Sequence, residues 1–150
     1  MCIVSDEELD AQGLRNWNAV IEGFRIINGG DLCSNFTQAS ADVYQMDVTY
    51  QGQAYTIAIS NNGNVWGDIF SVILSENWGA DEALVAITAI GELPALGIAR
   101  VGPALCIRHS VSLPSASIHA FTNGALMTAI GTDRIIEALR AHYELLQGPA

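Results

Sequence analysis

The side chains best suited to acid–base chemistry in this sequence are three histidines, His109, His119 and His142. A catalytic site needs a nucleophile and a base held together, and a Gly-x-Ser-x-Gly motif would mark one such arrangement. The sequence has no such motif, no His-x-x-x-His pair and no EF-hand loop. His109 stands in an alternating apolar run. A histidine in such a run is more often satisfied by a structural hydrogen bond than used in catalysis. We therefore expect no enzyme, no metal site and no cofactor.

The thiols and the basic residues lead to the same expectation. Cys2, Cys33 and Cys106 are far apart, without the Cys-x-x-Cys spacing that binds zinc or exchanges disulfides. We expect all three to be reduced thiols. The 6 basic residues are all arginines, so a P-loop lysine and a Schiff-base lysine are both ruled out.

Length and charge limit the class of protein further. A chain of 150 residues predicts one domain, residues 1–150, large enough to hold its own core. The formal net charge of -10 disfavours nucleic acid and favours basic protein segments as partners. No apolar run is long enough to span a membrane, and acidic residues stand near the N-terminus where a signal peptide carries basic ones. We expect a cytoplasmic protein without a membrane partner.

Apolar spacing divides the chain into helices and strands, separated by turns rich in Gly, Asn and Pro. Residues 31–41 show no period and are expected to form a loop. Gly124 and Gly131 are expected to bend or split the last helix. The expected helices are residues 5–27, 81–93 and 118–146, and the expected strands are residues 43–50, 54–60, 64–74, 96–101 and 105–113.

The third expected strand, residues 64–74, differs from the others because both of its faces are apolar. Covering both faces requires the domain's own helices on one side and another helix, a second subunit or a bound segment on the other. The alternative is that both faces are ordinary core. The residues predicted to bind a partner share one face of this strand: Trp66, Phe70, Val72 and Leu74.

The helix expected at residues 81–93 carries a stripe of four large apolar side chains, Leu84, Ile87, Ile90 and Leu93. Its remaining positions include several alanines, which allow another helix to approach closely. A helix-to-helix dimer contact and packing on the sheet explain these alanines equally well.

The order α-β-β-β-α-β-β-α resembles that of the small acidic chaperones of type III secretion and of the similar YbjN-like proteins. The pattern match extends over residues 43–74 and 82–146, and the segment Arg-His-Ser-Val-Ser-Leu-Pro at residues 108–114 resembles the final strand of YbjN-like sequences. This resemblance implies an α+β fold with a five-stranded antiparallel sheet and helices packed on it. It also implies a protein that is often dimeric, has no active site and offers apolar surface to an extended client segment.

The resulting hypothesis is a non-enzymatic, chaperone-like binding protein. Its expected partners are a second copy of itself and a client or regulatory protein. High apolar content, with a mean hydropathy of +0.28, agrees with surface that faces a partner. The alternative is a small ligand-binding protein or enzyme, with a pocket between the sheet and the last helix lined by Trp66, Phe70 and Tyr55 and with His109 inside.

Overall fold

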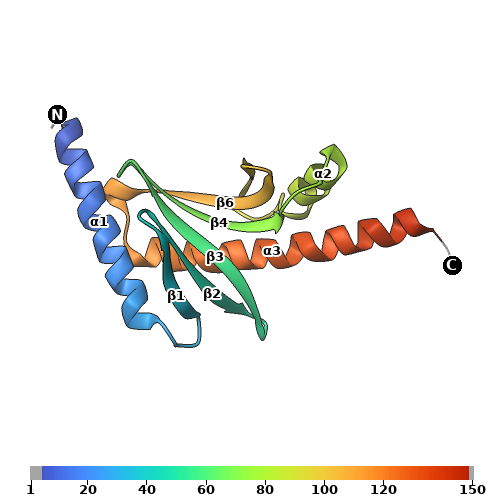
Figure 1. Cartoon of the computed structure of the whole chain (residues 1–150), viewed down its shortest axis with the longest axis horizontal. Coiled ribbons are helices and arrows are strands. Elements are labelled where there is room, and N and C mark those ends of the chain that lie inside the picture. Colours follow the sequence, from blue (N-terminus) through green and yellow to red (C-terminus); the bar gives the residue numbers. More distant parts are fainter. Residues whose placement is uncertain (1–4, 149–150) are drawn as a thin grey trace.

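The computed structural model describes residues 5–148, which form one antiparallel sheet and the helices packed against it (Figure 1). The sheet order is β1-β2-β3-β4-β6-β5. The helices are α1 (Asp6–Ile27), α2 (Ala80–Ala89) and α3 (Ile118–Gln147), with a short 3-10 helix at Leu113–Ser115. The strands are β1 (Cys33–Ser40), β2 (Val43–Tyr50), β3 (Gln53–Asn62), β4 (Trp66–Leu74), β5 (Gly97–Val101) and β6 (Ala104–Ser112).

The α+β class and the antiparallel sheet are confirmed, but the expected number of strands and the expected order are wrong. The sheet has six strands, because β1 occupies the segment expected to be a loop. Two register shifts interrupt its pairing with β2, and Asn35 has a positive φ of 54°. These irregularities remove the alternation that identifies a strand in sequence, so β1 exists through its pairing with β2 rather than through its own pattern.

Helix α1 begins where the sequence predicts, because Ser5 caps it. The Ser5 hydroxyl accepts from the Glu8 amide, and the Glu8 carboxylate accepts from the Ser5 amide, which completes a capping box. Three acidic residues fill the first turn, where the helix dipole favours negative charge. The buried apolar residues of this helix are Trp17, Val20, Ile21 and Phe24.

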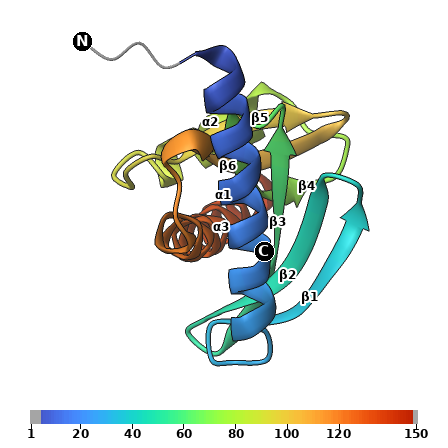
Figure 2. The ribbon, with the colours of Figure 1, turned by 90° about the vertical axis from the view of Figure 1, so that its left-hand side faces the viewer.

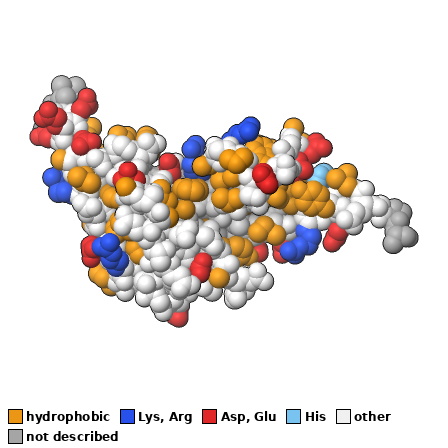
Figure 3. Space-filling view, in the orientation of Figure 1, with side chains coloured by type: hydrophobic (Ala, Val, Ile, Leu, Met, Phe, Trp, Pro, Cys, Tyr) orange, Lys and Arg blue, Asp and Glu red, His pale blue; other side chains and the backbone are white. Residues whose placement is uncertain are grey.

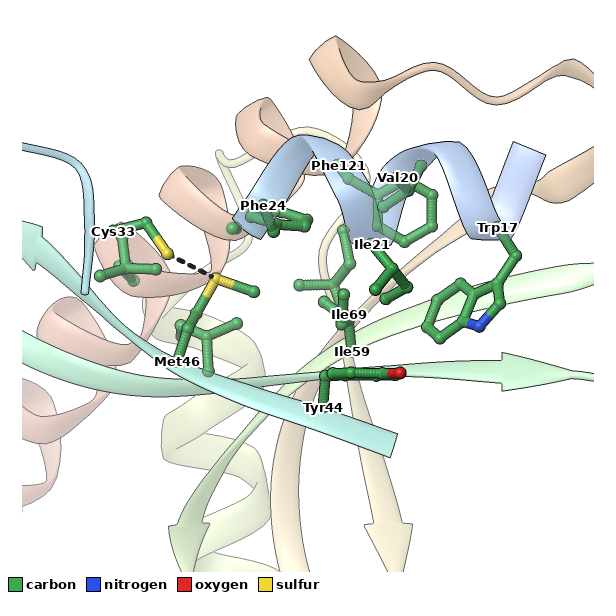
Figure 4. Packing of buried hydrophobic residues seen from close by; sticks show 14 of the residues in the cluster. Trp17, Val20, Ile21, Phe24, Cys33, Tyr44, Met46, Ile59, Ile69 and Phe121 are labelled. Carbon is green, nitrogen blue, oxygen red and sulfur yellow. Dashed lines mark hydrogen bonds between the residues drawn. The ribbon is translucent and has the colours of Figure 1, made fainter. Parts of the chain in front are cut away.

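The main core lies between the sheet and helices α1 and α3. Phe24 and Phe121 are fully buried against Met46 and the isoleucines of β3 and β4 (Figure 4). Helix α3 is continuous over 30 residues, so its glycines do not split it. Gly124 instead permits close contact, since an added Cβ would lie 2.5 Å from Ile69 Cδ1. The glycines of α3 therefore set how near the helix lies to the sheet.

A second core cluster joins α2 to β6 and the middle of α3. Ala86 and Ile90 are buried there with Ile135 and Leu139. Ala83 and Ala89 are partly buried against the same cluster, so three alanines of α2 pack within the chain. The expected apolar stripe is only partly buried: Leu84 is 63% exposed and Ile87 is 54% exposed, because the small side chains of α2 turn toward α3 instead.

Candidate partner-binding surface

The two faces of the sheet have different environments. Helix α3, seen end-on in Figure 2, lies on one side of the strands, and α1 crosses one end. In the described part of the chain, no helix lies on the opposite side. We call the covered side the inner face and the uncovered side the outer face. Side chains alternate along β4, so Gly67, Ile69 and Ser71 are buried on the inner face. Trp66 and Val72 point outward and are 48% and 51% exposed.

Three of the four residues predicted to bind a partner share the outer face, but Leu74 does not. A register shift separates Val72 from Leu74 in the pairing of β4 with β6. Leu74 consequently packs with Ile73 against the cluster formed by α2, β6 and α3. Trp66, Phe70 and Val72 remain as the outward-facing apolar residues of β4.

An apolar hollow of about 270 Å³ lies beside Phe70 and Val72 on the outer face. Its middle is β3, whose outward side chains are small, including Thr56 and Ala58. Pairing of β3 with β4 ends at Ala58 and Phe70, and beyond this point the Ser71 hydroxyl donates to the Thr56 carbonyl at 3.1 Å. Small residues and the end of the strand pairing thus create the hollow. Its other lining residues are Val43 and Gln45 from β2.

A second, polar hollow of about 320 Å³ adjoins Trp66 at the opposite end of β4. Asn62, Asp68, Arg108 and Ser110 complete its lining. The Ser110 hydroxyl donates to Asp68 Oδ1 at 2.6 Å. Within residues 5–148, Arg108 has no carboxylate within 4.0 Å, so its guanidinium is available to another molecule.

The outer face carries little of the net negative charge of the chain. The six strands direct Asp47, Asp68 and Arg108 to this face, and Arg100 instead lies over the Trp78 ring. Figure 3 shows the surface over β2 and β3 mainly in white, with acidic side chains gathered at the N-terminal tip of α1. This face can therefore approach an apolar partner without strong repulsion.

A further apolar surface is formed by α2 and the C-terminal half of α3. Leu84, Val85, Thr88, Ala89 and Ala138 line a hollow of about 340 Å³ between the two helices. Orange side chains gather over this region in Figure 3. The sequence placed Leu84 in the apolar stripe of this helix and left open whether the helix meets another helix or the sheet, so the exposure of Leu84 was not predicted from sequence.

The histidines lie apart from one another. His109 Nδ1 donates to the Ala95 carbonyl at 2.8 Å, and its ring lies against Gly124 of α3. This confirms the expected structural hydrogen bond. His119 is exposed near the start of α3, and His142 lies beside Tyr143 near its end.

Two of the cysteines are buried within the fold. Burial raises the pKa of the Cys33 thiol, with a smaller contribution from Asp47, and burial also raises the pKa of Cys106. A raised pKa disfavours the thiolate, which is the nucleophilic form. The Cys33 Sγ lies 3.4 Å from Met46 Sδ (Figure 4). Cys2 lies outside the described residues.

The alternative pocket expected from Tyr55, Trp66 and Phe70 is not formed, because these residues lie on opposite faces of the sheet. Tyr55 is on the inner face, where its hydroxyl donates to Asp133 of α3 at 2.5 Å. This hydrogen bond is the main cause that raises the pKa of Tyr55 to about 12. His109 lies on the inner face as well.

The sequence matches no known family model and no curated protein. The resemblance to YbjN-like and type III secretion chaperones therefore stays a prediction. Among residues 5–148, no three His, Cys, Asp or Glu side chains are grouped as metal ligands. Over the same residues, no helix is both long and apolar enough to cross a membrane.

Proposed function

We propose that this protein is a non-enzymatic binding protein that holds an extended segment of a client protein on the outer face of its sheet. The observation that carries this proposal is the exposure of Trp66 and Val72 on a face that no helix within residues 5–148 covers. Large exposed apolar side chains grouped on one face are typical of protein interaction sites.

The shape of the face favours a segment over a compact small molecule. The two hollows are shallow and separate, with volumes of about 270 Å³ and 320 Å³. Small-molecule sites usually enclose most of the ligand surface. Two open hollows spaced along β4 instead fit separate side chains of one extended chain, with the apolar hollow beside Val72 and the polar hollow beside Arg108.

The environments of the histidine and thiol side chains support the non-enzymatic part of the proposal. His109 is engaged by the Ala95 carbonyl, and the raised pKa values of Cys33 and Cys106 disfavour their thiolates. On the outer face itself, Asp68 is bonded to Ser110, and Arg108 can neutralise an acidic group of the client.

Selection from a library of short random displayed peptides tests this function. We expect enriched peptides with apolar residues, and we expect Trp66→Ser combined with Phe70→Ser to abolish their binding. Leu84→Ser combined with Ile87→Ser is the matched control, because it truncates two exposed apolar side chains of α2. Thermal melts of both double variants establish that they are folded.

Two results would contradict the proposal. One is a library that yields no binder to the folded chain. The other is a set of binders that survive the Trp66 and Phe70 changes but are lost with the Leu84 and Ile87 changes, which would place the binding site on α2.

A further inference from the structure

We propose that a second copy of this chain covers the outer face when no client is bound, with the two sheets stacked and their β4 strands antiparallel. This inference rests on the proposed function only because both use the outer face of the sheet. It names a specific partner and a specific register, both of which follow from charge and shape on the outer face.

Charge favours this face for self-association. Two copies that each carry a net charge of -10 repel one another over most of their surface. The outer face directs two carboxylates, Asp47 and Asp68, and one guanidinium, Arg108, toward a partner. Contact through this face therefore keeps most of the acidic side chains of the two copies apart.

Shape sets the register. Trp66 projects from one end of β4, and the apolar hollow beside Val72 lies at the other end, about 20 Å away along an extended strand. In a two-fold dimer every contact is made twice, so a projecting side chain and a hollow on one face can fill each other. Consider a two-fold axis in the plane midway between the two sheets, perpendicular to β4 and passing over Ile69. This axis places Trp66 of one copy over Val72 of the second copy.

The same axis aligns the charged groups. On each copy Phe70 pairs with Arg108, and the neighbouring row pairs Asp68 with Ser110. These two rows lie on either side of Ile69, so the axis places Arg108 over the Asp68–Ser110 pair of the second copy. Arg108 lacks a carboxylate partner within residues 5–148 of its own chain. Stacked sheets lie about 10 Å apart, a distance that outward Arg and Asp side chains can span together.

Charge reversal tests this register without an unknown ligand. Arg108→Asp and Asp68→Arg each place like charges opposite one another in the homodimer. Each change should weaken dimerisation at least about tenfold, as for close charge pairs across an interface. An equimolar mixture of the two variants should restore the dimer. The Asp68→Arg copy carries two positive charges at these positions, and the Arg108→Asp copy carries two negative charges opposite them.

Sedimentation of the full chain measures the association, with Arg134→Asp as the matched control. Arg134 is exposed on α3, so this variant has the same change of charge outside the interface and should dimerise normally. If either charge variant fails to fold, Trp66→Ser replaces it and should lose the dimer while remaining folded. A wild-type chain that is monomeric at several hundred micromolar overturns the inference, as does a mixture that associates no better than its components.

The outcomes separate this inference from the proposed function. A monomeric wild-type chain that still selects peptides through Trp66 and Phe70 would remove the dimer and leave client binding intact. If each charge variant weakens the dimer and their mixture restores it, while the library yields no binder, the dimer is supported and client binding is removed.

Discussion

Tyr55 of β3 and Asp133 of α3 are joined by a 2.5 Å hydrogen bond that ties the sheet to its longest helix. The bond is the main cause that raises the pKa of Tyr55 from 10.0 to about 12, with smaller contributions from burial and neighbouring charges. A group that holds its proton more tightly in the folded state stabilises the fold fully below the unfolded pKa, and this contribution is lost as pH rises through the folded pKa. The contribution of Tyr55 is therefore complete below about pH 10 and disappears between about pH 10 and 12.

Tyr55→Phe should lower the free energy of unfolding by roughly 1 to 2 kcal/mol at neutral pH, because Asp133 loses a hydrogen-bond donor. The difference between the variant and the wild-type chain should shrink as pH rises through the window from 10.0 to about 12. Urea unfolding at several pH values measures this. A difference that stays constant across the window would mean that the Tyr55 proton is not linked to folding. Tyr143→Phe, at an exposed position of α3, serves as the control for general alkaline effects.

Gly124→Ala should destabilise the protein by about 1 to 3 kcal/mol, the usual result of adding atoms to a packed core. The new Cβ would meet Ile69 Cδ1 at 2.5 Å and His109 Cδ2 at 2.7 Å. Helix propensity alone predicts the opposite sign, since alanine stabilises a helix interior by up to about 1 kcal/mol over glycine. Asn123→Ala, at an exposed position of the same helix, is the control and should be neutral or stabilising. A stabilised Gly124→Ala protein would contradict the close approach of α3 to the sheet.

Tryptophan fluorescence should report self-association through Trp66. This indole is 48% exposed, whereas Trp17 is 4% exposed. Stacking of the outer faces transfers Trp66 from water to an apolar environment, so the emission maximum should move to shorter wavelength as concentration rises. Trp66→Phe should abolish the shift while retaining most of the apolar contact. A shift that persists in this variant would indicate association through the region around Trp78 instead.

A peptide selected on the outer face should compete with the second copy. Because both occupants use Phe70 and Val72, saturating peptide should convert the dimer to a monomer with bound peptide, and dilution of the protein should raise the apparent affinity for peptide. Sedimentation with labelled peptide measures both effects. A peptide that binds the dimer without dissociating it would show that client and second copy occupy different surfaces.

Cys33 and Cys106 should resist alkylation in the folded protein. Both side chains are at most 1% exposed, and burial raises both pKa values. In a Cys2→Ser background, labelling by iodoacetamide at neutral pH should therefore follow global unfolding. Rapid labelling of either thiol under native conditions would reveal local opening of β1 or β6.

Local patterns in the sequence predicted much of this fold correctly. The apolar spacing of residues 5–27 predicts α1 with its correct start, and turns containing Gly52, Gly63 and Gly102, all with positive φ, end strands as expected. Alternation also predicts that Trp66, Phe70, Val72 and Leu74 share one face of their strand, which is correct for the first three and wrong for Leu74, beyond the register shift. These features depend on residues close in sequence, so a single sequence is enough to identify them.

Other features depend on which segments meet in three dimensions. β1 forms because β2 offers it hydrogen-bonding groups, although β1 has no alternation of its own. Leu84 is exposed because the alanine face of α2, rather than its leucine face, packs closely against α3. Alternation establishes which side chains share a face, but whether that face is buried depends on where the helices dock. The sequence by itself therefore determined that Trp66, Phe70 and Val72 lie together. Only the tertiary structure decided that no helix of the described chain covers them, because α1 and α3 both pack on the opposite face of the sheet.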